Sequence, residues 1–454
     1  MNKEYKEYRG SWIKVFAFLS TYCYILGFYL YFNLSVNTMG YCLIHGTFSS
    51  MLLIYVLDIM KQSRRENRFS VVLLFFYISV LYAHISCMKY VIQYLYLGFI
   101  EDNNDRLVGS LVVLFVMWAT IFIWNYFSKK HYHSNESAVT KLDEMNINQI
   151  MLWTLVIILG IVKLFAVKSG NANETKISFV VDLVMNITLA FTVINYKPGR
   201  IIVNRFKIPS GLLPIITIFS IYLYCALITG KRSAVIVLFV ILICSLIMLN
   251  KINFIYIEVV TVLAPIGIAC LTIALGMISK RYDFFGELLV RNLVYRFDLS
   301  DFAITLSSKM PHYQIETFID GIRSAIPAFI YPGKMNYLQS YYDLMSSCGL
   351  RAVEDFNDTV FSMGTQLFGY WGLFITFPLI SFFFSAVDTL LNKLDVKGMF
   401  LKILLIGYFA QSIESDWARF AVQTRNAILI ALIGYVVWVL INKLKLNRKI
   451  RLVL

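Results

Sequence analysis

The sequence has too few charged residues to cover the surface of a soluble protein of its length. Of its 454 residues only 15% are charged, whereas 59% are hydrophobic. A soluble domain carries about 25% charged residues, because polar side chains must face the water around its core. The composition therefore excludes an ordinary soluble enzyme and predicts an integral membrane protein.

The sequence also lacks the short motifs through which many enzymes bind nucleotides. It contains no Walker phosphate-binding loop, no GxGxxG motif after a strand, and no GxSxG, HExxH or paired CxxC motif. It has no acidic DxD triplet of the kind that holds Mg²⁺ together with a sugar nucleotide. These absences leave primary active transport without support and argue against a cytoplasmic enzyme that uses nucleotide sugars.

Cysteine and histidine are sparse, and their placement suggests neither a disulfide framework nor a metal cluster. The seven cysteines are Cys23, Cys42, Cys87, Cys225, Cys244, Cys270 and Cys348, and only the last lies outside an apolar block. The five histidines are His45, His84, His131, His133 and His312. Because His312 is the only histidine in the longest polar connection, we consider it a candidate general base.

The hydrophobic residues are gathered into blocks of about 20, the length that a helix needs to cross a bilayer. The blocks predict an all-α polytopic membrane protein of about twelve transmembrane helices. The first block follows a charged segment without a small-residue cleavage site, so we interpret it as a retained helix. The blocks span residues 12–32, 38–60, 69–89, 107–127, 148–168, 177–196, 212–229, 233–250, 254–279, 365–390, 399–413 and 422–441.

The basic residues predict how these helices are oriented. Most of the 41 lysines and arginines lie in alternate connections, at the ends of the apolar blocks. Since Lys and Arg are retained on the cytoplasmic side, this pattern places both termini in the cytoplasm. We therefore attribute the net charge of +14 to basic residues that orient the helices in the membrane. The expected partners are membrane lipids and not nucleic acid.

One connection, residues 280–364, is far longer than the others, and the orientation places it outside the cytoplasm. Links of this length are usually functional or disordered. Here the apolar spacing in GELLVRNLVYRF, IETFIDGIRSAI and NYLQSYYDLM is typical of helices. We therefore predict transmembrane helices 1–9 in residues 1–279, a helical outer loop on the membrane surface in 280–364, and transmembrane helices 10–12 with a basic tail in 365–454.

Several lysines and arginines lie on the predicted outer side of the membrane, where the preference of basic residues for the cytoplasmic side disfavours them. Lys231 and Arg232 occupy the turn between two blocks on the predicted outer side, where they cost insertion energy. A guanidinium can bind phosphate through two parallel hydrogen bonds. One interpretation is that the pair only touches the phosphates of ordinary phospholipids. We favour the other, that it holds an anionic lipid head group as a ligand. The predicted outer loop adds five arginines: Arg281, Arg291, Arg296, Arg323 and Arg351. For any one of them an ion pair is the simpler interpretation, but we predict that the group as a whole includes a ligand for phosphate.

Carboxylates just before the block at 365–390 are candidates for proton transfer. Glu354, Asp355 and Asp358 lie at the predicted membrane edge, where a carboxylate can take the proton of a sugar hydroxyl. The alternative is structural, because Asn357 or Asp358 before Thr359-Val360-Phe361 suits the start of a helix.

Charges also fall near and within the blocks. Lys163 and Asp182 lie at matching depth in neighbouring blocks, which predicts a structural ion pair.

The predicted outer link Glu414-Ser415-Asp416-Trp417-Ala418-Arg419 contains an aromatic side chain together with acidic and basic side chains. This mixture is found in sugar-binding sites and at membrane interfaces alike. Arg419 is therefore a further candidate for binding substrate.

Four features together resemble the bacterial oligosaccharide repeat-unit polymerases, also called O-antigen polymerases. They are the long outer loop near the C-terminal third, the arginine-bearing turn in LITGKRSAVIVL, the run Ala325-Ile326-Pro327 followed by Tyr331-Pro332-Gly333-Lys334, and the sequence LFGYWGL, like the FGxxG that opens the span after the loop. The similarity covers roughly residues 212–374, and the order of the motifs carries it. The N-terminal half matches only as generic membrane helices.

The resemblance implies an inner-membrane enzyme that joins repeat units carried on undecaprenyl diphosphate at the periplasmic face. It implies no cofactor, because the lipid diphosphate is already a good leaving group, and it implies a flippase and a chain-length regulator of the same pathway as partners. The outer cations (Lys231, Arg232, Arg291, Arg296, Arg323, Arg351 and Arg419) would stabilise the diphosphate. Asp355, Asp358 or His312 would accept the proton of the acceptor hydroxyl.

Two alternatives stay open. The related O-antigen ligases carry a histidine beside an asparagine shortly before the span after the loop, whereas this chain has Asp355-Phe356-Asn357-Asp358 there, which favours a polymerase. A flippase for lipid-linked oligosaccharide would also have about twelve spans. We expect it to have pseudo-repeated halves and no long outer loop, and internal repeats are not evident in the sequence.

Overall fold

The computed structural model describes residues 36–66, 70–86, 104–131, 141–142, 149–169, 172–203, 206–210, 212–229, 233–261, 299, 301–309, 311–327, 330–331 and 359–451. The helices are α2 (Val36–Arg65), α3 (Val71–Ser86), α5 (Asn104–His131), α7 (Gln149–Ser169), α8 (Ala172–Asn195), α9 (Leu212–Thr229), α10 (Ser233–Met248), α13 (Asp301–Lys309), α14 (Ile315–Ala325), α16 (Val360–Phe368), the 3₁₀ helix η3 (Gly369–Trp371), α17 (Gly372–Asn392), α18 (Asp395–Gln411) and α19 (Trp417–Arg451). The strands are β1 (Lys197–Val203) and β2 (Phe206–Ser210).

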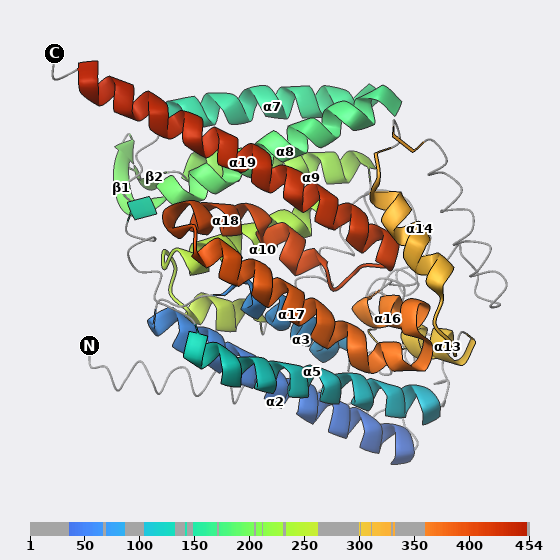
Figure 1. Cartoon of the computed structure of the whole chain (residues 1–454). Coiled ribbons are helices and arrows are strands. Elements are labelled where there is room, and N and C mark those ends of the chain that lie inside the picture. The colour runs from blue at the N-terminus through green and yellow to red at the C-terminus, as the bar shows by residue number, and fades with distance from the viewer. Residues whose placement is uncertain are drawn as a thin grey trace, which may run out of the picture.

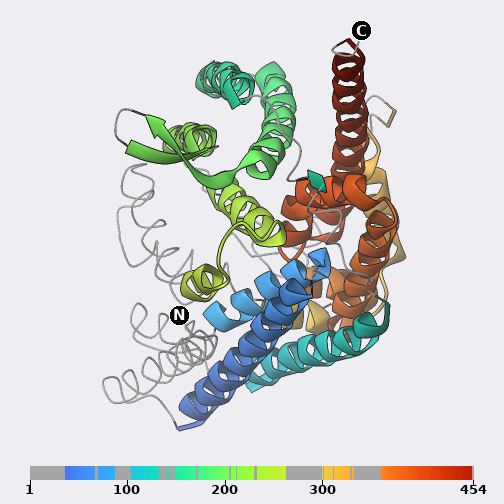
Figure 2. The same ribbon diagram turned by 90° about the vertical axis from the view of Figure 1, so that its left-hand side faces the viewer.

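The long helices lie side by side in one bundle, with their axes roughly parallel (Figure 1). The short helices α13 and α14 lie at one end of the bundle, which we name the cap end. The β1–β2 hairpin and the C-terminal end of α19 lie at the opposite end, which we name the tail end. Figure 2 shows α7, α8 and α9 as one group beside a second group that includes α2, α3, α5 and α17. Between the groups, α10 packs on α18, and α18 packs on α3 and α17.

The core of the bundle is built around α3. Of the 16 residues of this helix, all except Tyr82 and His84 are buried. Phenylalanine rings fill the space between α3 and α17: the ring centroid of Phe75 lies 5.2 Å from that of Phe377 and 5.2 Å from that of Phe384. A helix that is apolar on all sides is buried in a large core or crosses a membrane, so α3 is the central helix of the bundle.

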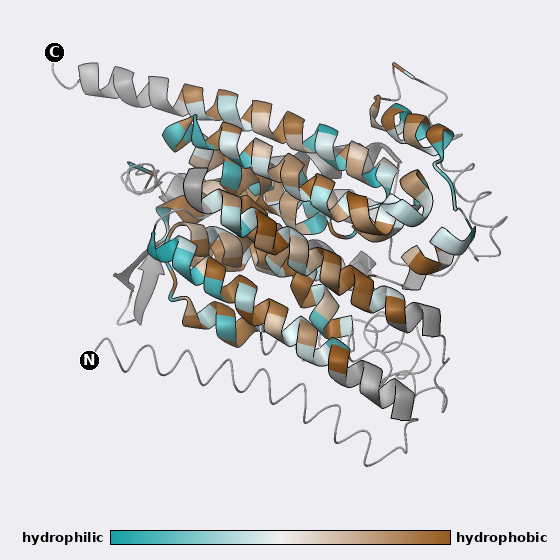
Figure 3. Ribbon diagram, turned by 60° about the horizontal axis from the view of Figure 1, so that its bottom comes forward, coloured by the Kyte–Doolittle hydropathy of each residue, from teal (hydrophilic) through white to brown (hydrophobic). Residues whose placement is uncertain are grey.

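Large apolar side chains are also exposed on the outside of the bundle, and Figure 3 shows hydrophobic residues recurring along its outer helices. On α5 and α17, for example, Phe115, Leu379 and Phe382 are each more than half exposed. Three helical runs among the described residues are long and apolar enough to cross a membrane: Val108–Ser128, Val360–Asn392 and Trp417–Leu440. An apolar exterior of this extent is compatible with a membrane protein and disfavoured in water.

The block predicted at 365–390 is not one straight helix. Instead α16 ends at Phe368, η3 turns the chain, and α17 begins at Gly372. At Gly369 the backbone φ is +55°, and a Cβ there would lie 2.3 Å from the carbonyl oxygen of Pro311. At Gly372 a Cβ would lie 2.0 Å from the backbone of Gly364, because α16 packs closely on α17. The two glycines of the FGxxG sequence are thus the residues that permit this turn.

The start of α16 bears on the structural alternative for Asn357 and Asp358, which was to cap this helix. The cap is instead Thr359, whose hydroxyl accepts a hydrogen bond from the peptide nitrogen of Ser362 at 3.3 Å. The hydroxyl of Ser362 in turn accepts from the peptide nitrogen of Thr359 at 2.7 Å, which completes a capping box. Asp358 is therefore not required as the cap.

The predicted all-α fold is confirmed in its main feature, since the described chain is almost entirely helical. Among the described residues the connection between α8 and α9 forms the antiparallel β1–β2 hairpin, for which the sequence analysis predicted no strands. Its Ile201, Ile202 and Val203 favour strands, and Pro198 and Pro209 do not continue a helix. The separation of α9 from α10 is as predicted. The block at 12–32 lies outside the described residues, and the total number of spans stays a prediction.

Candidate functional site at the cap end

The site forms where α14, from the segment 280–364, docks on the first turns of α19. The indole nitrogen of Trp417 donates a hydrogen bond to the carbonyl oxygen of Phe318 at 2.8 Å, and the two rings stack with centroids 5.1 Å apart. A second contact lies nearly two turns further along α14, where the Ser324 hydroxyl donates to the carbonyl oxygen of Ala418 at 3.3 Å. Because both contacts are buried or partly buried, they fix α14 against α19.

Gly321 allows this close approach. A Cβ at this position would lie 1.8 Å from a carbon of the Trp417 ring, far inside van der Waals contact. We therefore expect Gly321→Val to detach α14 from α19, whereas Glu316→Val, on an exposed position of the same helix, would leave it docked. Limited proteolysis in detergent measures this, with early cleavage near α14 only in Gly321→Val. Equal protection of the two variants would contradict the docking.

The connection between α18 and α19 lies beside this contact and carries the strongest candidate for proton transfer. The Tyr82 hydroxyl of α3 donates a hydrogen bond to Oε1 of Glu414. The carboxylate of Asp416 accepts from the peptide nitrogen of Arg419 at 2.6 Å and so caps α19. Asp416 therefore has a structural role, while the partly buried Glu414 has one oxygen that no described hydrogen bond occupies.

Burial raises the pKa of Glu414 to about 7, and the nearby positive charge of Arg419 opposes this rise. Desolvation disfavours the charged form of a carboxyl group, and an adjacent cation favours it. A pKa near the working pH is the value that serves a general base best, because the group is then ionised often enough and still binds the proton it removes.

Three cations belong to the same region. Arg323 of α14 is exposed and forms an ion pair with Asp320, with 3.1 Å between Nη1 and Oδ1. Arg419 is exposed on the first turn of α19. Arg425, one to two turns further along α19, donates from Nη1 to the carbonyl oxygen of Ala325 at 3.1 Å and so helps to hold the end of α14.

Of the predicted site residues, the structure therefore brings Arg323 and Arg419 to neighbouring elements. His312 lies elsewhere: it is exposed next to Pro311, where the backbone approaches Gly369, and Tyr313 stacks on Phe368 with ring centroids 5.8 Å apart. The other predicted residues lie outside the described part of the chain. They are Lys231, Arg232, Arg291, Arg296, Arg351, Asp355 and Asp358.

Sequence reasoning missed Glu414 and Arg425 as individual candidates. Glu414 was noticed only as part of a mixed link, because burial against Tyr82 is not visible in a sequence. Arg425 lies inside the block predicted at 422–441, and a charge within a predicted span is itself a signal of a required contact.

The ion pair predicted between Lys163 and Asp182 is confirmed. Nζ of Lys163 donates to Oδ1 of Asp182, and the Tyr222 hydroxyl of α9 donates to the same oxygen. The ammonium group also lies 4.5 Å from the centroid of the Tyr222 ring. Tyr222, which the sequence analysis did not include, therefore links the pair to a third helix.

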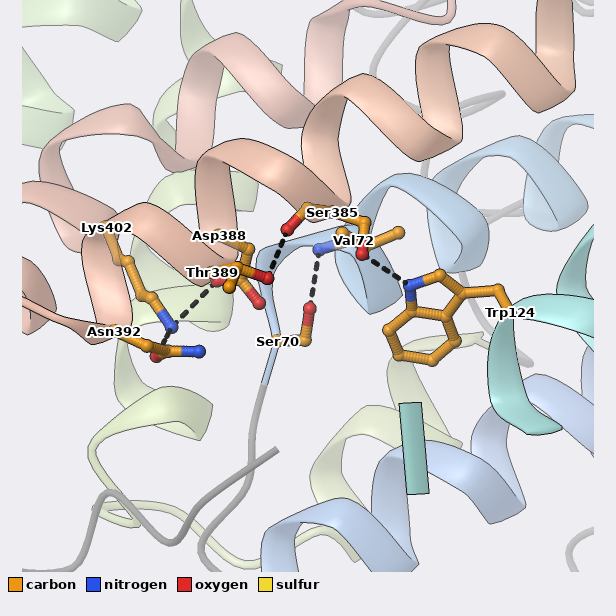
Figure 4. A network of polar contacts seen from close by, with 8 residues as sticks. All are labelled: Ser70, Val72, Trp124, Ser385, Asp388, Thr389, Asn392 and Lys402. Atoms are coloured by element: carbon orange, nitrogen blue, oxygen red, sulfur yellow. Dashed lines mark hydrogen bonds and ion pairs between the residues drawn. The ribbon is translucent and has the colours of Figure 1, made fainter. Parts of the chain in front are cut away.

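A second buried pair was not predicted. Lys402 of α18 lies 2.7 Å from Asp388 of α17, and both side chains are almost completely buried. Lys402 also donates to Oδ1 of Asn392 at 2.5 Å (Figure 4). Both charges fall inside predicted blocks, so the rule that found Lys163 and Asp182 applies to them equally.

Comparisons with protein-family models, with curated proteins and with solved structures find no match to this chain.

Proposed function

We propose that the chain is a metal-independent glycosyltransferase that polymerises oligosaccharide repeat units carried on undecaprenyl diphosphate. In this proposal it lies in the inner membrane of a bacterium, with both termini in the cytoplasm and the cap end on the periplasmic face. The growing chain moves from its lipid carrier onto the next lipid-linked unit, which lengthens a surface polysaccharide such as an O-antigen or a capsule.

The reaction requires one base and several cations. The hydroxyl oxygen of the acceptor sugar forms a bond to the anomeric carbon of the donor, and the bond from that carbon to the diphosphate oxygen breaks. The hydroxyl proton goes to a carboxylate, and the leaving undecaprenyl diphosphate keeps the bond electrons and an added negative charge. Preorganised cations stabilise that charge without any metal.

The observation that supports the proposal best is the grouping of these residue types at the cap end. Glu414 supplies a carboxyl group whose pKa is about 7, Arg419 lies on the first turn of α19 just after it, and Arg323 is carried by α14 on the neighbouring segment. We assign the base to Glu414 and diphosphate binding to Arg419 and Arg323. The predicted base candidates Asp355, Asp358 and His312 are secondary in this assignment.

The direction of α9 supports a role for Lys231 and Arg232 at the same end. Its first residue, Leu212, follows β2, which lies at the tail end, and the 18-residue helix runs from there toward the cap end. Arg232 comes three residues after the last residue of α9. A phosphate ligand at this position is therefore compatible with a site at the cap end.

A strain that lacks the gene tests this function against its alternatives. If the chain is a polymerase, the surface glycan of that strain carries a single repeat unit on its acceptor. Full-length polymer that stays on the lipid carrier would indicate a ligase instead. Accumulation of lipid-linked units on the cytoplasmic side would indicate a flippase, and either result would overturn the proposal.

Arg232→Ala is expected to leave the protein in the membrane at normal amounts but to shorten the surface glycan to single repeats. The reason is that the alanine variant loses a bidentate ligand for the diphosphate. Arg232→Lys keeps the charge without the planar fork, so we expect glycan of intermediate length. Electrophoresis of the glycan measures chain length, and wild-type length in Arg232→Ala would remove Arg232 from the mechanism.

A further inference from the structure

The helix α14 presents three different faces. Successive residues of a helix are rotated by about 100°, so the side chains of α14 separate into sectors. One sector, with Phe318, Gly321 and Ser324, packs on α19. The other two sectors do not face α19, and their chemistry differs.

The second sector is apolar and exposed. Ile315, Ile319 and Ile322 follow one another at intervals of four and three residues, which places them on one stripe of the helix. Their exposed fractions are 57%, 40% and 47%. The third sector, on the far side of this stripe from α19, is charged and contains Glu316, Asp320 and Arg323. A stripe of exposed isoleucines between a docked face and a charged face needs an apolar partner.

The position of α14 identifies that partner. The helix lies at the cap end of the bundle, alongside the first turns of α19 (Figure 1). Aromatic rings are exposed close by, at Tyr313 before α14 and at Tyr370 and Trp371 in η3, whose exposed fractions are 51%, 53% and 69%. Tyr and Trp concentrate where a bilayer meets water. The apolar exterior of α17 continues directly from these rings.

We propose that α14 is a membrane-contacting helix at the bilayer surface, with Ile315, Ile319 and Ile322 immersed among the acyl chains of the outer leaflet. The charged sector faces water, as in other amphipathic helices that lie at the boundary between head groups and acyl chains. This inference is independent of the enzymatic activity. Its consequence is that Arg323 lies at head-group depth, the level at which a lipid-linked diphosphate is located.

Fluorescence quenching in nanodiscs tests the proposal. The variants Ile319→Cys and Ile322→Cys, each in the full chain with Cys348→Ser, are labelled with an environment-sensitive NBD probe and reconstituted with phosphatidylcholine and phosphatidylglycerol. Glu316→Cys is the matched control on the charged sector. Because the three positions are exposed, these changes do not disturb the contact with α19.

Probes at Ile319 and Ile322 are expected to be quenched several-fold more strongly by doxyl-labelled lipids than the probe at Glu316. Iodide in the aqueous phase should show the opposite order. Strong iodide quenching at all three positions would place the stripe in water. Shielding of the isoleucine positions from both quenchers would show that protein covers them, either a second copy or another segment. Each of these two results would overturn the proposal.

Discussion

Glu414→Gln is expected to lower the rate of glycosyl transfer by about 10²–10⁴-fold, the usual contribution of a general base. Glutamine keeps the size of the side chain, and its oxygen still accepts the hydrogen bond from Tyr82, so the fold is preserved. Only the ability to accept the hydroxyl proton is lost. The measurement is the rate at which purified protein in proteoliposomes extends lipid-linked repeat units.

The control is Glu316→Gln, which makes the same chemical change on the exposed sector of α14. We expect its rate to stay close to that of the wild type. If Glu414→Gln were as active as this control, Glu414 would not be the base, and one of the candidates before α16 would have to replace it.

The pH dependence gives an independent result for the same residue. Since the base acts in its ionised form and its pKa is about 7, the rate should rise from pH 6 to pH 8 with its midpoint near 7. The charge of Arg419 lowers the pKa of Glu414. Arg419→Gln should therefore move the midpoint to higher pH. A midpoint that does not move in this variant would contradict the electrostatic coupling of the two residues.

The second large effect concerns stability. Lys402→Ala is expected to destabilise the bundle by about 3–5 kcal/mol, because it leaves the carboxylate of Asp388 buried without its partner. The double variant Lys402→Met with Asp388→Leu removes both charges and keeps the volume. It should recover most of this loss, since well-packed apolar residues often replace a buried ion pair without cost. Thermal unfolding in detergent compares the two variants.

The exposed pair between Lys141 and Asp395 provides the comparison. Its atoms are 3.4 Å apart and both side chains are more than half exposed. Lys141→Ala should therefore change stability by no more than about 1 kcal/mol. If Lys402→Ala had an equally small effect, or if the double variant were as unstable as the single one, the buried pair would not hold α17 to α18 in the way described.

The positions of several helices follow from the sequence because long apolar blocks favour helices that are buried or cross a membrane. The block at 212–229 coincides with α9, and the ion pair between Lys163 and Asp182 follows from the cost of an unpaired charge in an apolar interior. The break between α16 and α17 was not predicted. It depends on a positive φ at Gly369 and on a contact with Pro311, more than fifty residues earlier. Neither feature can be predicted from the spacing of hydrophobic residues.

The candidate site was predictable only in part, for a similar reason. Arg419 and Arg323 were identified by their charge at the predicted outer face. The raised pKa of Glu414 depends on burial beside Tyr82, which is distant in sequence. The carboxylates of Glu414 and Asp416 are only two residues apart but have different roles. Glu414 is buried beside Tyr82, whereas Asp416 accepts a hydrogen bond from the peptide nitrogen of Arg419 and caps α19.

The most direct test of the account is reconstitution of the purified full-length chain with repeat units linked to undecaprenyl diphosphate, without nucleotides and in the presence of a metal chelator. The account predicts a ladder of longer lipid-linked glycans and the release of one undecaprenyl diphosphate for each unit added, with both lost in Glu414→Gln. Movement of intact lipid-linked units between leaflets, with no change in their length, would contradict it.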